Sequence, residues 1–313
     1  MSLALLCSGQ GSQHAGMFAL TGDAPAAAGL FAQAAALLGG RDPRDLVASE
    51  DSTALHHDRV GQILCTLQAL VAAVALRDAL PAKLVVAGYS VGEVAAWSVA
   101  GLMDAGDTLD LAARRAEAMD SASRPGDGML FVRGLPRDVV DSLCAWHGAA
   151  VAIVNPGDAF VIGGSRAARD AFAAAARKMN AAKVVDIAVE VASHTTLLAA
   201  ASAAFLQDLK HVTVHPAPPG TRLLSGIDAA PVLDVPAGLD KLAAQISQTV
   251  HWSDCLQACV EAGATAFLEF GPGRALSNMA SGAYPNVAAR SLDDFKSLQG
   301  ARAWLAKVGA SGV

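Results

Sequence analysis

The clearest pattern of apolar and polar positions lies at residues 84–100, where a short apolar run gives way to glycines and then to an alanine-rich segment. Residues 85–87 are consecutively apolar, as in a strand that is buried on both faces of a parallel sheet. Residues 93–100 favour a helix, because alanine has the highest helix propensity. The intervening GYSVG, at residues 88–92, therefore predicts a sharp turn from strand to helix.

Apolar periodicity predicts further elements on both sides of this turn. Apolar runs indicate strands at residues 3–7 and 265–270, and helical spacing indicates helices at residues 24–40, 60–80 and 104–122. This alternation of strands and helices is typical of a doubly wound sheet. A helix is also expected from residue 274, whereas the proline-rich residues 213–238 predict a traversing segment with one strand at 222–225.

The pattern of predicted strands and helices changes after a break at residues 124–128, which contain glycine and proline. The elements expected beyond it are strands at 129–133, 151–154, 160–163 and 183–191, and helices at 136–146 and 167–179. Their βαββαβ order is that of a ferredoxin-like unit. The sequence thus predicts an α/β protein in which a large domain, residues 1–126 and 192–313, carries an inserted ferredoxin-like small domain at residues 127–191.

Ser90 is the candidate nucleophile. Glycines flank it at two residues on either side, which is the spacing of a nucleophile elbow, and such a turn holds the serine in a strained backbone conformation. The hydroxyl would then lie at the positive end of the following helix, where a developing oxyanion is stabilised.

Three other positions allow a functional and a structural interpretation. The loop at residues 8–13 follows a predicted strand, and its backbone N–H groups could face a ligand or simply form a tight turn. Arg115, like its neighbour Arg114, could bind a substrate carboxylate or pair with a nearby acid. His194 begins a helix and could cap it, or could act with Ser90.

The composition narrows the classes of function. A net charge of −6 over 313 residues, without any basic run, argues against nucleic-acid binding. The longest apolar stretch is interrupted by Gln68, Arg77 and Lys83, so we expect no membrane span, and the N-terminal residues lack the basic region of a signal peptide. Five irregularly spaced cysteines indicate reduced thiols and a cytoplasmic location.

Two further motifs are similar to a zinc site and to a phosphate-binding loop, but we expect neither kind of site. His251, Cys255 and Cys259 recur every fourth residue and could be zinc ligands, but no CxxC pair or fourth ligand accompanies them, so we expect no metal. The GPG at residues 271–273 lacks the lysine of a phosphate-binding loop and predicts a structural turn.

Five motifs occur in an order that resembles the malonyl-CoA:acyl carrier protein transacylase family. They are GQGSQ at 9–13, GYSVGE at 88–93, the RxxxM of Arg115 and Met119, VASH at 191–194, and GPG at 271–273. The similarity extends from residue 3 to about residue 279 and implies an α/β-hydrolase-like large domain with an inserted ferredoxin-like domain. It also implies that malonyl-CoA is the substrate, that a phosphopantetheine-type thiol on a carrier protein is the acceptor, and that no cofactor is needed.

The resemblance assigns roles to individual residues. Ser90 matches the acyl-accepting serine and His194 its general base, and in this family a glutamine backbone carbonyl, here that of Gln245, orients the histidine. The remaining matches are the oxyanion-hole donors Gln10 and Val91, the malonyl-binding Arg115, and the substrate-binding positions Met119, Asn155 and Tyr89.

Two departures from the family pattern refine the expectation. Thr249 replaces the usual proline of the QLxxPVxW stretch, and Tyr89 replaces the histidine that usually precedes the nucleophile. The GYSVGE form resembles the transacylase (epsilon) subunit of malonate decarboxylase, so the expected partners are the carrier protein of that complex and its other subunits.

Three alternatives stay open. One is a transacylase of fatty acid or polyketide synthesis. Another is a serine thioesterase or hydrolase, whose histidine would pair with an acid such as Asp104, Asp107 or Asp186. The last is a non-catalytic docking subunit.

Overall fold

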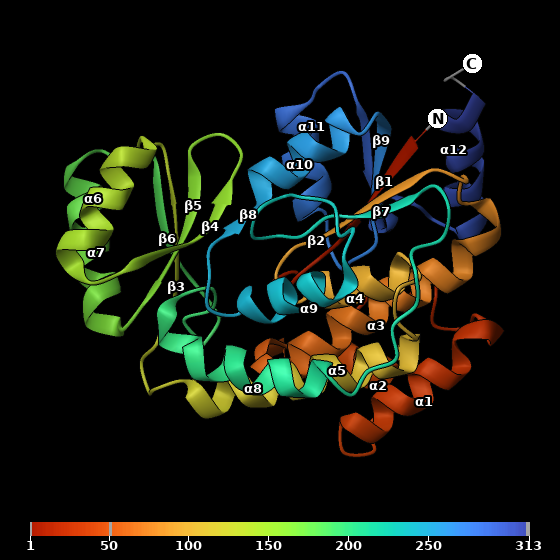
Figure 1. Cartoon of the computed structure of the whole chain (residues 1–313), viewed down its shortest axis with the longest axis horizontal. Coiled ribbons are helices and arrows are strands. Elements are labelled where there is room, and N and C mark those ends of the chain that lie inside the picture. Colours follow the sequence, from red (N-terminus) through yellow and green to blue (C-terminus); the bar gives the residue numbers. More distant parts are fainter. Residues whose placement is uncertain (1, 50–51, 311–313) are drawn as a thin grey trace.

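Two five-stranded sheets form the framework of the protein (Figure 1). The computed structural model describes residues 2–49 and 52–310. The larger sheet has the order β10-β9-β1-β2-β7, and all of its neighbouring strands are parallel. Its strands are β1 (Ser2–Cys7), β2 (Leu84–Gly88), β7 (Thr221–Leu223), β9 (Ala264–Glu269) and β10 (Ala288–Ser291).

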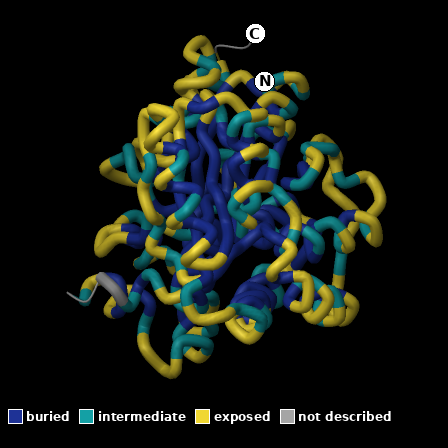
Figure 2. Tube along the Cα trace, turned by 90° about the vertical axis from the view of Figure 1, so that its left-hand side faces the viewer, coloured by how far each residue is buried: buried dark blue, intermediate teal, exposed yellow. Residues whose placement is uncertain are grey.

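Helices cover both faces of the parallel sheet, as its consecutive apolar strands require. Alternate residues of β1 face opposite sides: Leu3 and Leu5 pack into one hydrophobic cluster, Ala4 and Leu6 into another. The first cluster includes side chains of α3 (Asp58–Leu76), α4 (Gly92–Val99), α5 (Ala105–Ala122), α8 (Ala199–Leu209), α9 (Val235–Ala244) and α12 (Leu298–Ala310). The second includes α10 (Trp252–Glu261) and α11 (Ala275–Ala283). Figure 2 shows this buried interior running through the centre of the molecule.

The central helix α3 corrects one expectation from the sequence. The segment Asp58–Ala79 contains an 18-residue window with a mean hydropathy of 1.6, and by length and composition alone it could cross a membrane. The prediction that Gln68 and Arg77 keep the apolar stretch shorter than a membrane span was therefore wrong. Since 78% of its most apolar window is buried inside the protein, the segment is placed as a core helix.

The smaller sheet lies at the left of Figure 1, and two helices cover it. Its elements are β3 (Gly128–Arg133), α6 (Arg137–His147), β4 (Ala150–Asn155), β5 (Ala159–Gly164), α7 (Arg166–Lys178) and β6 (Lys183–Ile187). The antiparallel order β6-β3-β5-β4 is that of the predicted ferredoxin-like unit. A fifth strand, β8 (Val250–His251), pairs in parallel with β4 from outside the predicted insertion. The domain boundaries stay a prediction.

Several predicted elements differ from the structure in extent. The helix expected at 24–40 consists of η1 (Pro25–Ala27) and α1 (Ala28–Leu37), and β6 ends at Ile187 rather than at residue 191. Helices α9 and α12 and strands β8 and β10 were not predicted. The short helices that complete the chain are α2 (Pro43–Ala48), η2 (Ser52–His56), η3 (Arg77–Ala79), η4 (Thr196–Leu198) and η5 (Leu292–Asp294).

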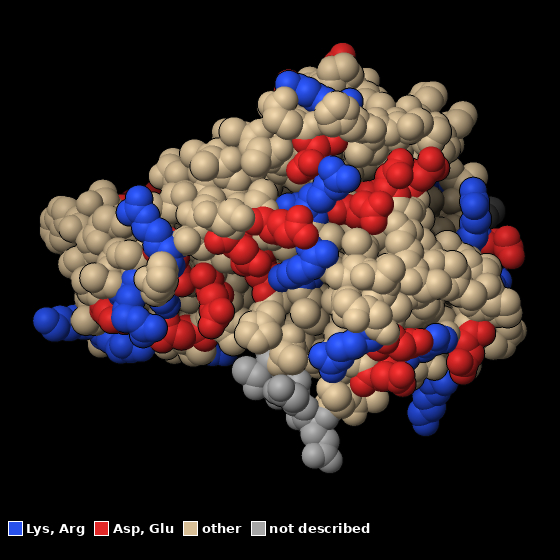
Figure 3. Space-filling view, turned by 90° about the horizontal axis from the view of Figure 1, so that it is seen from below, with Lys and Arg blue, Asp and Glu red and all other residues tan. Residues whose placement is uncertain are grey.

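Acidic and basic side chains alternate on the face shown in Figure 3, with no large area of one sign. Ion pairs of this kind join neighbouring helices: Arg114 of α5 donates to Asp208 of α8 at 3.0 Å. Arg114 therefore pairs with an acid, which was the structural interpretation of this residue. Of the two adjacent arginines, only Arg115 is buried.

Candidate active site

The turn between β2 and α4 has the geometry of a nucleophile elbow. Ser90 has a φ of 56°, a left-handed conformation that side chains rarely adopt. A Cβ at Gly88 would lie 2.2 Å from the nitrogen of Glu93, and one at Gly92 would lie 2.0 Å from the carbonyl oxygen of Cys7. Only hydrogen fits at these two positions, which is why the chain carries glycine on both sides of the serine.

His194 lies beside Ser90 although 104 positions separate them in sequence. Its Nε2 is 2.8 Å from the Ser90 hydroxyl, and its Nδ1 is 2.6 Å from the carbonyl oxygen of Gln245. Because a carbonyl can only accept, Nδ1 carries the proton and Nε2 is left to accept from the serine. The imidazole is thus oriented as a base toward the hydroxyl.

The electrostatic surroundings keep this imidazole neutral. His194 is 1% exposed, and burial together with the charge of Arg115 lowers its pKa to about 3. The acids Asp104, Asp107 and Asp186 do not orient it, since both ring nitrogens already bond Ser90 and Gln245. Asp186 instead pairs with Arg169 at 2.9 Å.

The loop after β1 lies against the elbow. A Cβ added at Gly9 would be 3.3 Å from the Cβ of Ser90, so the backbone at Gln10 runs next to the serine. Among residues 2–49 and 52–310, the backbone N–H groups of Gln10 and Val91 donate to no protein acceptor. Ser8 anchors the loop by donating to the buried Glu269 at 2.7 Å.

Arg115 is fully buried within the same network. It donates to the side-chain oxygen of Gln62 at 2.7 Å and to that of Gln245 at 3.2 Å. Its Nε is buried and has no hydrogen-bond partner in the described part of the chain. Burial lowers the pKa of the guanidinium to about 10, while the nearby Asp58 and Glu93 oppose that shift. Arg115 therefore remains a cation at neutral pH.

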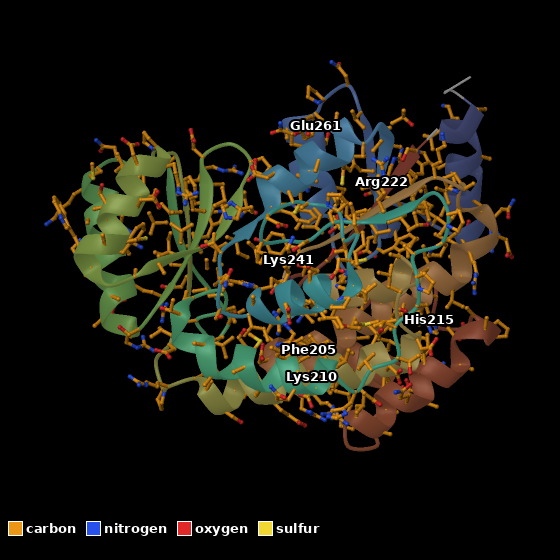
Figure 4. All side chains as sticks on the ribbon, in the orientation of Figure 1. Phe205, Lys210, His215, Arg222, Lys241 and Glu261 are labelled. Carbon is orange, nitrogen blue, oxygen red and sulfur yellow. The ribbon has the colours of Figure 1, made fainter. Side chains whose placement is uncertain are left out.

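Gln245 connects Arg115 to the serine. It follows directly after α9, the helix that carries the labelled Lys241 in Figure 4. Its side-chain nitrogen donates to the backbone oxygen of Ser90 at 3.1 Å and to Glu93 at 2.5 Å. Because its backbone oxygen also accepts from His194, this one residue joins Arg115 to both the serine and the histidine.

The predicted substrate-binding residues occupy three different surroundings. Met119 is buried with its sulfur 3.4 Å from the side-chain nitrogen of Gln62. Asn155 is 4% exposed, and its amide lies against the Tyr89 side chain, where it partly opposes the rise in the pKa of that phenol. Tyr89 packs edge-on against Trp252 with ring centroids 5.4 Å apart, and burial raises its pKa to about 12.

Sequence reasoning missed Gln62, Asp58 and Glu93. Gln62 donates to Asp58 at 2.8 Å, and Glu93 also accepts from the backbone nitrogen of Gly226 at 3.0 Å. Burial raises the pKa of Asp58 to about 6 and that of Glu93 to about 7. The available signal was a glutamine near the start of a largely apolar helix, since buried amides are rarely left without partners.

The remaining motifs are not part of this site. Cys255 and Cys259 are buried, free thiols, and within the described ranges no group of three or more metal-ligating side chains could hold an ion. The GPG segment is a turn whose Gly273 nitrogen donates to Asp293 at 2.6 Å.

A strained serine, a neutral histidine oriented toward it and unused N–H groups beside it form an arrangement that is typical of serine-dependent acyl transfer. The sequence agrees with this class, because the model of the acyl transferase domain family matches residues 4–288. The chain belongs to that family and is an acyltransferase.

Its relatives share both sequence and fold. The malonyl CoA-acyl carrier protein transacylase of Mycobacterium tuberculosis is 33% identical over 301 residues, covering 93% of this chain and 96% of the relative. The Escherichia coli protein of that name is 28% identical over 304 residues, with the same coverage of 93% and 96%. The crystal structure of an acyl-carrier-protein S-malonyltransferase from Burkholderia pseudomallei superimposes with a TM-score of 0.88 at 29% identity, over 97% of this chain and all of that one. The fold class predicted from the sequence is confirmed by these likenesses.

Proposed function

We propose that the protein transfers a malonyl group from malonyl-CoA to the thiol of an acyl carrier protein through an acyl-enzyme on Ser90. The observation that carries this proposal is the hydrogen-bonded chain from Ser90 through His194 to the carbonyl of Gln245. The names of the relatives support the substrate and the acceptor.

The geometry supports a two-step displacement. Ser90 Oγ attacks the thioester carbonyl while His194 Nε2 takes the hydroxyl proton. The tetrahedral oxyanion is stabilised by the N–H groups of Gln10 and Val91. Collapse of this intermediate breaks the carbon–sulfur bond, and His194 returns the proton to the leaving CoA thiolate. The carrier thiol reverses these steps and takes the acyl group.

Arg115 gives the site its preference for malonyl groups. A buried cation that donates only to two neutral amides lacks a carboxylate partner, and the free carboxylate of malonyl supplies one. Acetyl-CoA has no group that makes this contact, so the site distinguishes the two thioesters by charge. Met119, Asn155 and Tyr89 are proposed to line the path of the substrate.

For the acceptor we propose the carrier subunit of malonate decarboxylase, with other subunits of that complex as partners in the cytoplasm. The support is the GYSVGE form of the elbow, with Tyr89 before the nucleophile. Carriers of fatty acid or polyketide synthesis are the alternative acceptors, and the names of the relatives specify an acyl carrier protein without naming its pathway.

Intact mass spectrometry tests the proposal. The protein is incubated with malonyl-CoA, and then separately with holo forms of a malonate decarboxylase carrier and a fatty acid carrier. We expect a malonyl adduct on the wild type and none on Ser90→Ala, followed by its loss to one carrier.

Each other outcome identifies a different function. No adduct on the wild type would overturn the acyl-enzyme and favour a docking subunit. Release of free malonate faster than transfer to either thiol would favour a hydrolase. Preferential transfer to the fatty acid carrier would overturn only the assignment to malonate decarboxylase.

A further inference from the structure

Arg115 lies between two matching arrangements of an amide and a carboxyl. On one side, Gln62 accepts from Arg115 and donates to Asp58 at 2.8 Å. On the other side, Gln245 accepts from Arg115 and donates to Glu93 at 2.5 Å. In each arrangement a neutral amide separates the guanidinium from a buried carboxyl.

These carboxyls balance the charge of Arg115 without touching it. No ion pair of Arg115 is present in the described ranges, although a buried cation would ordinarily bond a carboxylate directly. Arg115 Nε and Asp58 Oδ1 are both buried and make no hydrogen bond of ordinary geometry within the same residues. The side chain of Gln10 lies against Asp58, where it donates to the backbone oxygen at 3.1 Å and lowers the pKa of the carboxyl. A direct pair of Arg115 and Asp58 would satisfy Nε and Oδ1, but it would also occupy the position that a substrate carboxylate needs.

We propose that Asp58 and Glu93 are positioning residues that aim Arg115 through Gln62 and Gln245 and leave its direct anion-binding position to the carboxylate of the acyl substrate. The inference rests on the proposed function, because it assigns a role in recognising the malonyl group. In this proposal, Asp58 and Glu93 do not contact the substrate and act on it only through the side-chain amides of Gln62 and Gln245.

The physical basis is the orientation of each amide. A glutamine side chain can rotate to exchange its oxygen and its NH2 group, and the wrong orientation would point a donor at the guanidinium. A carboxylate accepts only, so Asp58 holds the NH2 group of Gln62 and thereby keeps its oxygen toward Arg115.

The two carboxyls differ in what else they influence. The contacts of Gln62 stay within the group formed by Asp58, Arg115 and Met119. Gln245, held by Glu93, also bonds Ser90 and His194. Loss of Asp58 should therefore affect recognition of the carboxylate, whereas loss of Glu93 should affect the reaction of every acyl group.

The test for Asp58 compares two substitutions. Asp58→Ala removes the acceptor, and we expect the KM for malonyl-CoA to rise about tenfold while kcat stays within about threefold. Acylation by acetyl-CoA should not change. Asp58→Asn keeps an oxygen for Gln62 and should restore the KM to within about threefold of the wild type.

The test for Glu93 uses the same substrates. Glu93→Ala removes the acceptor of Gln245, and we expect kcat to fall about tenfold for malonyl-CoA and acetyl-CoA alike, because the shared Gln245 is released. Glu93→Gln keeps an oxygen for Gln245 and should restore kcat to within about threefold of the wild type. Thr66→Val is the matched control, since Thr66 is buried on α3 one turn beyond Gln62 and its hydroxyl bonds nothing described. It should behave as the wild type.

Calorimetric titration with free malonate separates this inference from the proposed function, because it reports binding without chemistry. Asp58→Ala should weaken malonate binding about tenfold while thermal unfolding shows a folded protein. Unchanged malonate affinity in Asp58→Ala, or equal losses for malonyl and acetyl groups, would overturn the role of Asp58. Absence of the malonyl adduct on wild-type Ser90, with the malonate result intact, would overturn only the proposed function.

Discussion

The residues proposed to carry out the reaction and those proposed to recognise the substrate, here called the reacting half and the recognising half, use their hydrogen bonds differently. In the reacting half, Ser90, His194 and Gln245 bond one another at 2.6–3.1 Å. In the recognising half, Arg115 Nε is buried without a hydrogen-bond partner among the described residues. The serine, the histidine and the glutamine thus orient one another within the protein, whereas Arg115 keeps a donor that a ligand can satisfy.

This difference has an energetic consequence. Each buried polar group without a partner costs about 1–3 kcal/mol, and a ligand that bonds it recovers part of that cost on binding. Specificity can therefore arise from groups that the chain leaves unsatisfied. Substitutions in the reacting half should affect all acyl groups, and those in the recognising half should affect malonyl groups most.

The largest effect is expected from His194→Ala. Loss of the base should lower kcat/KM about 10³- to 10⁴-fold, and by the same factor for malonyl-CoA and acetyl-CoA. Stopped-flow measurement of CoA release with both thioesters checks this. A loss confined to malonyl-CoA would contradict the division into two halves.

A smaller and selective effect is expected from Arg115→Ala. Removing one partner of a buried charge contact should lower kcat/KM for malonyl-CoA about 10²- to 10³-fold and leave acetyl transfer nearly unchanged. Arg115→Lys keeps the charge but loses the planar guanidinium. Its kcat/KM for malonyl-CoA should lie between the values of the wild type and Arg115→Ala. Competition between the two thioesters in one reaction measures the ratio of their kcat/KM values. Equal losses for malonyl-CoA and acetyl-CoA would show that Arg115 does not recognise the malonyl group.

The buried imidazole should also make stability depend on pH. The pKa of His194 is about 3 in the folded protein and about 6.5 when unfolded, so the unfolded state binds more protons between these values. Its contribution to stability is full above pH 6.5 and falls by roughly 1 kcal/mol per pH unit below it.

Comparison with His194→Gln isolates this contribution, because Asp58 and Glu93 titrate in both proteins. We expect the free energy of unfolding of the wild type to decrease relative to the variant between pH 6.5 and 4.5. Chemical denaturation at several pH values measures the difference. A difference that does not change with pH would exclude a neutral, buried His194.

The smallest effect is expected from Asn155→Ala. Asn155 is proposed to line the substrate path, and loss of one ordinary hydrogen bond from its amide should raise the KM about fivefold with kcat unchanged. Steady-state kinetics check this. A fall in kcat without a change in KM would assign Asn155 to the reacting half instead.

The nucleophile elbow was predictable because all of its determinants are local. Ser90 and the flanking glycines lie within five residues, and the adjoining apolar and alanine-rich segments set the strand and the helix. The βαββαβ order of the small sheet was predictable for the same reason, since each element carries its own periodicity.

The missed elements have weak local signals. Strand β8 has only two residues and exists because β4 offers it a parallel partner. Strand β6 was predicted four residues too long, because apolar Val189 and Val191 continue the pattern after the chain has left the sheet. Burial of those residues in other clusters, rather than strand pairing, explains their apolar character.

The sequence by itself determined the elbow, the parallel and ferredoxin-like units, and the residue types needed for acyl transfer. Only the tertiary structure decided that Gln62 and Gln245 hold Arg115, with Asp58 and Glu93 behind them. The reason is that local propensity acts over a few residues, whereas the contacts of Arg115 join positions 53 and 130 residues apart and form only when three helices pack together.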